Sequence, residues 1–323
     1  MARQEALHPA RTLDISPALP AATAASHPKP AGTERWLIWL FLLPTVLFLV
    51  LLLWLPFLQG VWMSFHKWPF IGEPRWVGLQ NYRDLFGATY FWTTIWVTLL
   101  YSLSTALQLA LALAAALALN QSFIRLKSVW RGVMLMPYAM PPVVVGAIWM
   151  YLLDPDLGMV THYLLRWGII SEPIYWFSDP LWAKWIIMLV SSWTFWPFMF
   201  IILLAALQAI PEGYYELAEV YGANLWRRFR VVTLPHIRGA MLAAVIIRIA
   251  WNLAKIEQPF QLTGGGPGYE TSVLSILTYR FAYLSGDFGM AFTVGLLLIL
   301  VTFVLIAPFL RGFQKQVKQA RRR

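Results

Sequence analysis

The sequence contains no cysteine and few charged residues. Charged residues make up 12% of its 323 residues, about half of the roughly 25% that is usual in soluble proteins. Hydrophobic residues make up 59%, and the mean hydropathy is +0.61. Without cysteine there are no disulfides, thiolate metal sites or cysteine nucleophiles. Without a charged shell the chain does not form a soluble globular domain, so we expect lipid to surround most of it.

Sequence patterns for phosphate binding and for metal binding are also missing. No Gly-Lys dipeptide occurs, which excludes a P-loop. The glycine-rich run Gly264–Gly268 follows no strand and opens no helix, so we interpret it as a tight turn outside the membrane. The five histidines form no pair at helical spacing, and no span holds a pair of carboxylates. We therefore expect no catalytic residue, no metal site and no cofactor.

Six apolar stretches are long enough for membrane-spanning helices, which need about 20 residues. They cover Trp36–Leu58, Trp92–Leu119, Val129–Leu153, Leu181–Ile210, Ala240–Gln258 and Ala291–Leu310. The loops are too short for a soluble domain, so the sequence predicts one all-α integral membrane domain with six transmembrane helices over residues 36–310. Residues 1–35, in which prolines lie among Ala, Ser and Thr, are expected to form a disordered cytoplasmic tail, and residues 311–323 a basic cytoplasmic tail.

The formal net charge of +10 has two interpretations. It could attract nucleic acid, but in a membrane protein Lys and Arg concentrate in the cytoplasmic segments. With the N-terminus placed inside, 17 of the 25 Lys and Arg residues fall in inside segments. We therefore expect a multi-pass protein with both termini cytoplasmic, surrounded by the lipid bilayer, with no nucleic-acid partner.

The inside loop of residues 211–235, between the fourth and fifth spans, is the most informative segment. Pro211 suits the first turn of a short helix that runs to about Tyr221. Gly222 then permits a tight turn, and a second short amphipathic helix follows until Pro235 ends it. The sequence predicts a helix-turn-helix on the cytoplasmic side, compact enough to fill a groove on a partner protein.

This loop resembles the EAA loop of the integral-membrane subunits of binding-protein-dependent ABC importers. The residues that match the family pattern are Glu216, Ala218, Gly222, Leu234 and Pro235. Two apolar positions depart from it, because Leu217 replaces an alanine and Val232 an isoleucine. The resemblance implies that the loop couples the chain to an ATPase subunit, through Tyr215, Glu216, Ala218, Glu219, Gly222, Leu234 and Pro235.

Residues 207–211 and 262–267 are similar to the carbohydrate-uptake branch that includes the maltose-transporter membrane subunits. In that branch a second homologous permease subunit pairs with the first, two ATP-binding subunits dock on the cytoplasmic side, and an extracytoplasmic solute-binding protein delivers the solute. The resemblance therefore implies a permease subunit in a bacterial or archaeal cytoplasmic (inner) membrane. Such a subunit forms half of a path for a sugar or a sugar-derived solute.

Polar residues of the fifth span are candidates for that path. Arg248, Asn252 and Lys255 share one helix face, because they follow i, i+4, i+7 spacing. A charge within the membrane is costly unless it faces a cavity or a partner. The alternatives are pairing with a carboxylate of the second subunit or, for Lys255, reaching the outer surface. In the resembled family this stretch lines the substrate path, which favours Asn252 and adds Glu257.

The fourth span contributes Trp193 and Thr194 as further candidates. An aromatic ring can stack on the apolar face of a sugar while a hydroxyl bonds to its polar groups. Packing between helices is the alternative role, since most tryptophans of a membrane chain serve in packing or at the interface.

Two other classes of function stay open at this point. A membrane-embedded enzyme would need a cluster of acid, base or metal-binding groups, and an ion-coupled secondary transporter would need carboxylates within its spans. Glu257 is the one carboxylate in such a position. The solute is also open, because the donors Arg248 and Lys255 suit a sugar phosphate, glycerol phosphate or another polar anionic solute as well as a neutral sugar.

Overall fold

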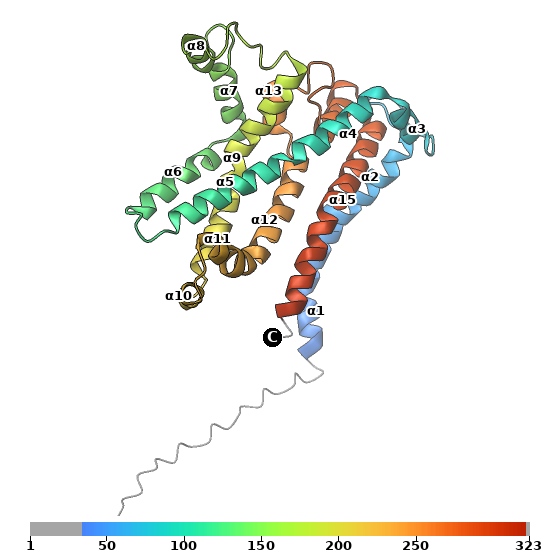
Figure 1. The fold of residues 1–323 in the computed structure, drawn as a ribbon. Helices are drawn as coiled ribbons and strands as arrows, with labels where there is room; N and C mark the ends of the chain where they lie inside the picture. Colours follow the sequence, from blue (N-terminus) through green and yellow to red (C-terminus); the bar gives the residue numbers. More distant parts are fainter. Residues whose placement is uncertain (1–33, 321–323) are drawn as a thin grey trace, which may run out of the picture. The chain divides into compact units, whose positions relative to one another are not determined.

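The structure is a computed structural model that describes residues 34–320. The tail expected over residues 1–35 lies outside the described residues, except for Glu34 and Arg35 at the start of the first helix. The chain divides into two compact units, residues 1–56 and 57–323. The described part of the first unit is helical, and the second unit holds nearly all of the fold (Figure 1).

The elements follow one another along the chain almost without strands. In order they are α1 (Glu34–Leu49), η1 (Val50–Trp54), α2 (Leu55–Ser64), β1 (His66–Lys67), β2 (Arg75–Trp76), α3 (Gln80–Gly87), α4 (Thr89–Ser102), α5 (Ser104–Leu119), α6 (Lys127–Ala139), α7 (Pro142–Leu152), α8 (Met159–Arg166), α9 (Pro180–Gln208), α10 (Gly213–Val220), α11 (Leu225–Arg228), η2 (Phe229–Thr233), α12 (Leu234–Ala254), α13 (Glu257–Thr263), α14 (Leu274–Tyr279), η3 (Arg280–Leu284) and α15 (Phe288–Ala320). The elements η1, η2 and η3 are π-helical turns.

Within residues 34–320, five continuous helices are long and apolar enough to cross a membrane. They cover Trp39–Ser64, Thr89–Leu119, Pro180–Gln208, Leu225–Ala254 and Phe288–Lys318. A sixth span exists if α6 and α7, which meet at a 90° bend, are counted together. The all-α membrane fold predicted from the sequence is therefore confirmed. The last helix continues to Ala320, so the segment expected as a basic tail is helical over residues 311–320.

The bend between α6 and α7 follows from two consecutive prolines. Met140 precedes Pro141 and adopts an extended conformation, which is the usual effect of a following proline. Pro142 then opens α7, where its missing N–H costs nothing. The span expected over Val129–Leu153, in which these two prolines allow a kink, is thus bent at the prolines.

The fifth predicted span also ends early. Helix α12 stops at Ala254, Lys255 is extended, and the short helix α13 starts at Glu257. A continuous helix would drive the ring of Pro259 into the carbonyl of Lys255, four residues earlier. The expected helix to Gln258 is thus broken, and α13 packs against α7 and α9.

Helix α9 is the centre of the second unit. It packs against α5, α6 and α12, which lie around it in Figure 1. Its Met199, Phe200 and Leu203 are at most 1% exposed and join residues of α5 and α12 in the largest apolar cluster. A polar side chain on these faces is therefore removed from solvent and needs a partner within the protein.

Two turns at the ends of the bundle are exposed. The turn between β1 and β2 carries Ile71, which is 87% exposed.

The turn between α5 and α6 ends at Leu126, whose φ of 55° is positive. A left-handed backbone costs a residue with a side chain roughly 1–2 kcal/mol. Leu126 is the one non-glycine residue of this kind in the part of the chain that the structure describes.

Candidate functional site

The 211–235 hairpin contains α10, α11 and η2, and it projects from one end of the second unit (Figure 1). Gly222 makes the turn with a φ of +71°. Its N–H donates to the carbonyl of Glu219 at 2.8 Å, and the N–H of Ala223 donates to that of Ala218 at 3.0 Å. Asn224 then caps α11, because its Oδ1 accepts from the N–H of Arg227 at 2.9 Å. The two helices and the glycine turn agree with the sequence-based expectation.

The end of this hairpin differs from the expectation. Pro235 does not end a helix, because α11, η2 and α12 form one continuous helix, Leu225–Ala254. In the π-turn η2 the backbone hydrogen bond spans five residues instead of four, so the N–H of Leu234 donates to the carbonyl of Phe229. Pro235, which has no N–H to donate, directly follows this wider turn, and the turn accommodates its ring within the continuous helix. The hairpin is thereby joined rigidly to the fifth span.

Side chains fix α10 against α11 and η2. The hydroxyls of Tyr215 and Thr233 lie 3.1 Å apart. The guanidinium of Arg228 forms an ion pair with Glu219 at 3.6 Å and lies 5.7 Å from the centre of the Tyr215 ring. Of these residues, Arg228 and Thr233 were not among the sequence candidates. Neighbouring sequence features could have identified them, since Arg228 lies in the basic run and Thr233 directly precedes Leu234-Pro235.

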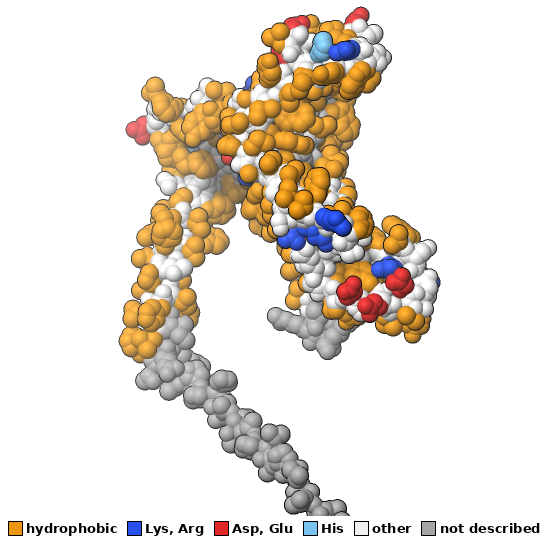
Figure 2. Space-filling model, turned by 90° about the vertical axis from the view of Figure 1, so that its left-hand side faces the viewer, with side chains coloured by type: hydrophobic (Ala, Val, Ile, Leu, Met, Phe, Trp, Pro, Cys, Tyr) orange, Lys and Arg blue, Asp and Glu red, His pale blue; other side chains and the backbone are white. Residues whose placement is uncertain are grey.

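The outer surface of the hairpin is apolar and exposed. Large side chains there are more than half exposed, namely Leu217, Val220, Tyr221, Leu225 and Trp226. Glu216 is exposed beside them, and Figure 2 shows acidic side chains gathered at this end of the molecule. Contiguous exposed apolar surface of this kind marks an interaction site.

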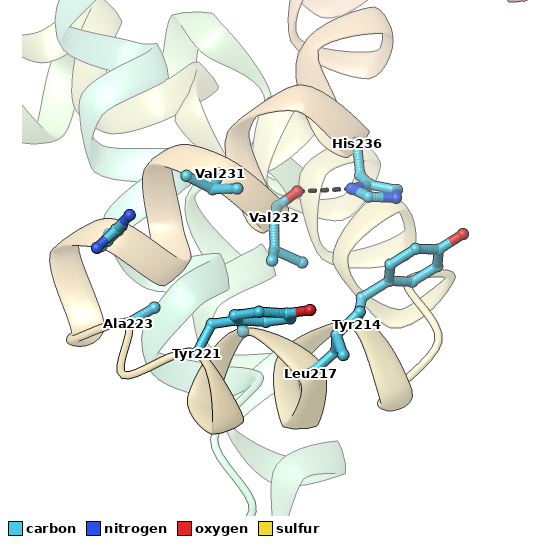
Figure 3. A pocket seen from close by; sticks show the side chains of 9 residues that line it. Tyr214, Leu217, Tyr221, Ala223, Val231, Val232 and His236 are labelled. Carbon is cyan, nitrogen blue, oxygen red and sulfur yellow. Dashed lines mark hydrogen bonds between the residues drawn. The ribbon is translucent and has the colours of Figure 1, made fainter.

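Two hollows flank α10. One, of about 390 Å³, lies between α10 and the start of the fifth span (Figure 3) and is lined by Tyr214, Leu217, Ala218, Tyr221, Ala223, Arg227, Val231, Val232 and His236. The second, of about 620 Å³, opens on the other side and includes Asn120, Gln121 and Ser122 from the turn after α5. The turn after α5 therefore lies at the same end of the unit as the hairpin.

A polar network is buried in the middle of the bundle. Arg248 of α12 is fully buried, and its Nε donates to Oε1 of Gln108 on α5 at 2.9 Å. Its Nη2 donates to Oδ1 of Asn252. The guanidinium also lies over the ring of Phe195 on α9, 4.6 Å from its centre. Arg248 thus links its own helix to α5 and α9, and every one of these partners is uncharged.

Asn252 extends the network toward the start of α5. Its Nδ2 donates to Oγ1 of Thr105 at 2.9 Å and to Oγ of Ser104 at 3.3 Å. Gln108 also turns its Nε2 toward the carbonyl of Ser191 on α9, at 3.4 Å. Sequence reasoning missed the α5 members. Their signal is a group of polar residues, Ser104, Thr105 and Gln108, within an otherwise apolar helix.

The remaining path candidates lie apart from this network. Thr194 is buried, and its Oγ1 accepts from Nε2 of Gln258 at 2.7 Å. Trp193 is partly buried and meets Trp149 edge to face at 5.8 Å. Lys255 is partly buried with its Nζ 5.1 Å from the centre of the Phe195 ring, and Glu257 is exposed in the first turn of α13. The structure therefore brings Lys255 to the same ring of Phe195 as Arg248, whereas Thr194, Trp193 and Glu257 have other surroundings.

The network predicts that Gln108 stabilises the buried charge. Replacing Gln108 by Leu removes the acceptor of Arg248 Nε and should lower the free energy of unfolding by about 1.5–3 kcal/mol, the usual contribution of a hydrogen bond to a charged group. The double substitution Gln108→Leu with Arg248→Met leaves no charge and should recover most of this loss. Unfolding of the purified protein by sodium dodecyl sulfate, followed by circular dichroism, measures both.

The matched control is Gln121→Leu, since Gln121 is an exposed glutamine just beyond the end of α5. It should change the stability little. A double variant as unstable as Gln108→Leu alone would show that the network does not compensate for the charge of Arg248.

Comparison with known proteins agrees with this architecture. Residues 108–315 match the family described as binding-protein-dependent transport system inner membrane component. The trehalose/maltose transport system permease protein MalF of Thermococcus litoralis is 34% identical over 85% of this chain and 92% of its own. The sn-glycerol-3-phosphate transport system permease protein UgpA of Pectobacterium atrosepticum is 28% identical over 90% of this chain and 98% of its own.

Solved structures give the same result. A chain from a bacterial ABC transporter involved in the import of the acidic polysaccharide alginate superposes with a TM-score of 0.71 at 25% identity, and the match covers 88% of this chain and 96% of that one. The family match spans more than half of the sequence and includes the 211–235 hairpin together with Gln108, Arg248 and Asn252. The chain therefore belongs to the family of binding-protein-dependent transport system inner membrane components, and it is a membrane-spanning permease subunit of an ABC importer.

Proposed function

We propose that this permease forms half of a translocation path for a sugar or a sugar-derived solute and that its 211–235 hairpin couples it to a separate ATPase subunit. The observation that carries the coupling role is the hairpin itself. It is an exposed apolar surface that is joined, through the π-turn η2, to a helix running into the buried centre of the bundle. Force applied to the hairpin is thereby applied to the fifth span.

The coupling residues divide into two groups by position. Glu216 is exposed at the surface that a partner would cover, with Glu219 beside it in an ion pair with Arg228. Tyr215 and Ala218 are partly buried and support α10 from beneath, while Gly222 makes the turn. Leu234 and Pro235 lie at the junction with α12. We infer that the first group contacts the ATPase subunit and that the second group keeps the hairpin rigid.

The partners follow from the same proposal. The chain holds no P-loop, so a complete importer needs two ATP-binding subunits, a second homologous permease subunit and an extracytoplasmic solute-binding protein. The family description names the dependence on a binding protein. The solute class rests on relatives named for trehalose/maltose and for sn-glycerol-3-phosphate. An anionic solute remains the second candidate, because Lys255 offers a partly exposed ammonium beside Phe195.

Replacing Gly222 by Val should abolish coupled transport. Nothing lies within 4 Å of a Cβ at this position, so the effect comes from its φ of +71° and not from a clash. A β-branched residue there costs roughly 1–2 kcal/mol or more and reorients α10. Solute uptake into proteoliposomes that contain the whole importer is the measurement. Gly213→Val is the matched control, since Gly213 also has free space around it but no positive φ, and normal uptake by Gly222→Val would refute the coupling role.

Sidedness can be tested because the chain has no native cysteine. We propose that both termini and the 211–235 hairpin are cytoplasmic and that the turn between β1 and β2 is outside. Val220→Cys, at a position 83% exposed in the hairpin, should react with a membrane-impermeant maleimide only after the cells are opened. Ile71→Cys, at a position 87% exposed, should react in intact cells once the outer envelope has been removed. The reverse pattern would invert the topology.

The aromatic part of the path can be tested at Trp193. If its ring stacks on a sugar, Trp193→Ala should reduce solute uptake roughly threefold to tenfold, which corresponds to about 0.5–1.5 kcal/mol of stacking. The basal ATPase activity of the importer should stay unchanged. Trp185→Ala on the same helix is the control, because Trp185 is 55% exposed on another face of α9. Equal effects of the two substitutions would assign Trp193 to packing alone.

A further inference from the structure

The turn between α5 and α6 has features that neither transport nor coupling explains. Phe123 is 76% exposed and Leu126 is 74% exposed, directly after a membrane-spanning helix ends at Leu119. Leu126 also adopts the left-handed backbone conformation that residues with side chains avoid. In water, the exposed leucine side chain contributes no free energy that would offset the cost of this backbone conformation. The conformation becomes favourable if the leucine side chain is buried in an apolar environment outside this chain, because the free energy of burying a leucine exceeds the cost of the strain.

Cations are interleaved with these apolar side chains. Arg125 is exposed, and Lys127 and Arg131 are partly exposed on α6. Lys127, Trp130 and Arg131 follow i, i+3, i+4 spacing and share a face of α6, on which Trp130 is 50% exposed. Among residues 34–320 the ion pairs are Lys184–Glu270 and Arg228–Glu219, so none of the three cations has an acidic partner there. Figure 2 faces this side of the molecule and shows Lys and Arg side chains gathered next to hydrophobic ones.

We propose that Phe123, Arg125, Leu126, Lys127, Trp130 and Arg131 form an interfacial anchor that binds the headgroups of anionic phospholipids. Phe123 and Leu126 enter the acyl region, Trp130 lies at the headgroup level, and the three cations reach the phosphates. Arginine and lysine can do this while their aliphatic stems stay in contact with apolar surface.

Charge distinguishes a lipid surface from a protein partner as the occupant. The anchor follows directly on Asn120, Gln121 and Ser122, which line one hollow together with residues of the 211–235 hairpin, so the two segments lie at the same end of the unit. The 211–235 hairpin carries three glutamates and three arginines, and therefore has no net charge that would attract it to an anionic membrane surface. The anchor carries cations only and attracts that surface. The two neighbouring segments are therefore suited to different surroundings, the hairpin to a protein partner and the anchor to the bilayer.

Site-directed spin labelling of the full-length chain tests this proposal. Leu126→Cys and, as a matched control, Val220→Cys are each labelled with a nitroxide in the cysteine-free chain and reconstituted into vesicles. The accessibility of each label to oxygen, which concentrates in lipid, is divided by its accessibility to a water-soluble nickel chelate. In an equimolar mixture of phosphatidylcholine and phosphatidylglycerol, we expect this ratio to be several-fold higher at residue 126 than at residue 220.

The lipid charge is the second variable. The ratio at residue 126 should fall in vesicles of phosphatidylcholine alone, and the triple substitution Arg125→Gln, Lys127→Gln, Arg131→Gln should remove its dependence on phosphatidylglycerol. A ratio at residue 126 equal to that at residue 220 would place the turn in water and overturn the proposal. A label shielded from both reagents would show that protein covers it, and a ratio independent of lipid charge would exclude headgroup recognition. None of these readouts involves transport, so their failure leaves the coupling role untouched.

Discussion

A backbone within hydrocarbon must satisfy its own hydrogen bonds, and the rest of this structure depends on that constraint. At two helix interruptions, a side chain supplies a partner for a backbone carbonyl. After the break at Ala254, the carbonyl of Lys255 accepts from Oγ of Ser275 at 3.4 Å. At the π-turn η2, Nδ1 of His236 donates to the carbonyl of Val232 at 2.6 Å. The double proline between α6 and α7 removes two donors that would otherwise need partners.

The same constraint explains how a fully buried arginine is tolerated. Arg248 donates to two neutral oxygens and lies over the face of an aromatic ring, so groups on α5, α9 and α12 together stabilise its charge. Its Nη1 is buried without a hydrogen-bond partner among the described residues, so the hypothesis that it pairs with a carboxylate of another subunit stays open. Helix α12 connects this network to the 211–235 hairpin without a break. The hairpin and the buried network are thus two ends of one rigid element.

Hydropathy alone located the helices, because each span must be apolar along its length. The prolines mark where interruptions are possible, as at Pro141 and Pro142, but they do not decide which of these sites is interrupted, since proline acts differently in different settings. Pro197 lies inside α9, Pro235 is accommodated by the π-turn before it, and Pro259 marks a break. These outcomes depend on hydrogen-bonding partners that are distant in the sequence.

The functional residues likewise divide into those that a local sequence pattern identifies and those that depend on partners distant in the sequence. The glycine, the glutamates and the Leu-Pro pair of the hairpin form a local pattern, so a resemblance could identify them. The partners of Arg248 could not be identified in this way, because Gln108 lies 140 positions away in the sequence. Helical spacing applies to Arg248 and Asn252 but not to Lys255, which lies beyond the end of α12, and only the packing of α5 against α12 showed that neutral groups surround the charge.

The central claim is that this permease moves solute with energy from ATP hydrolysis by another subunit. Uptake of labelled solute should be measured in proteoliposomes that contain this chain and its partner permease, with and without the ATP-binding subunits and the binding protein. The account predicts uptake only when all components and ATP are present, and no response to a proton or sodium gradient. Uptake driven by an ion gradient in the absence of the ATP-binding subunits would contradict it.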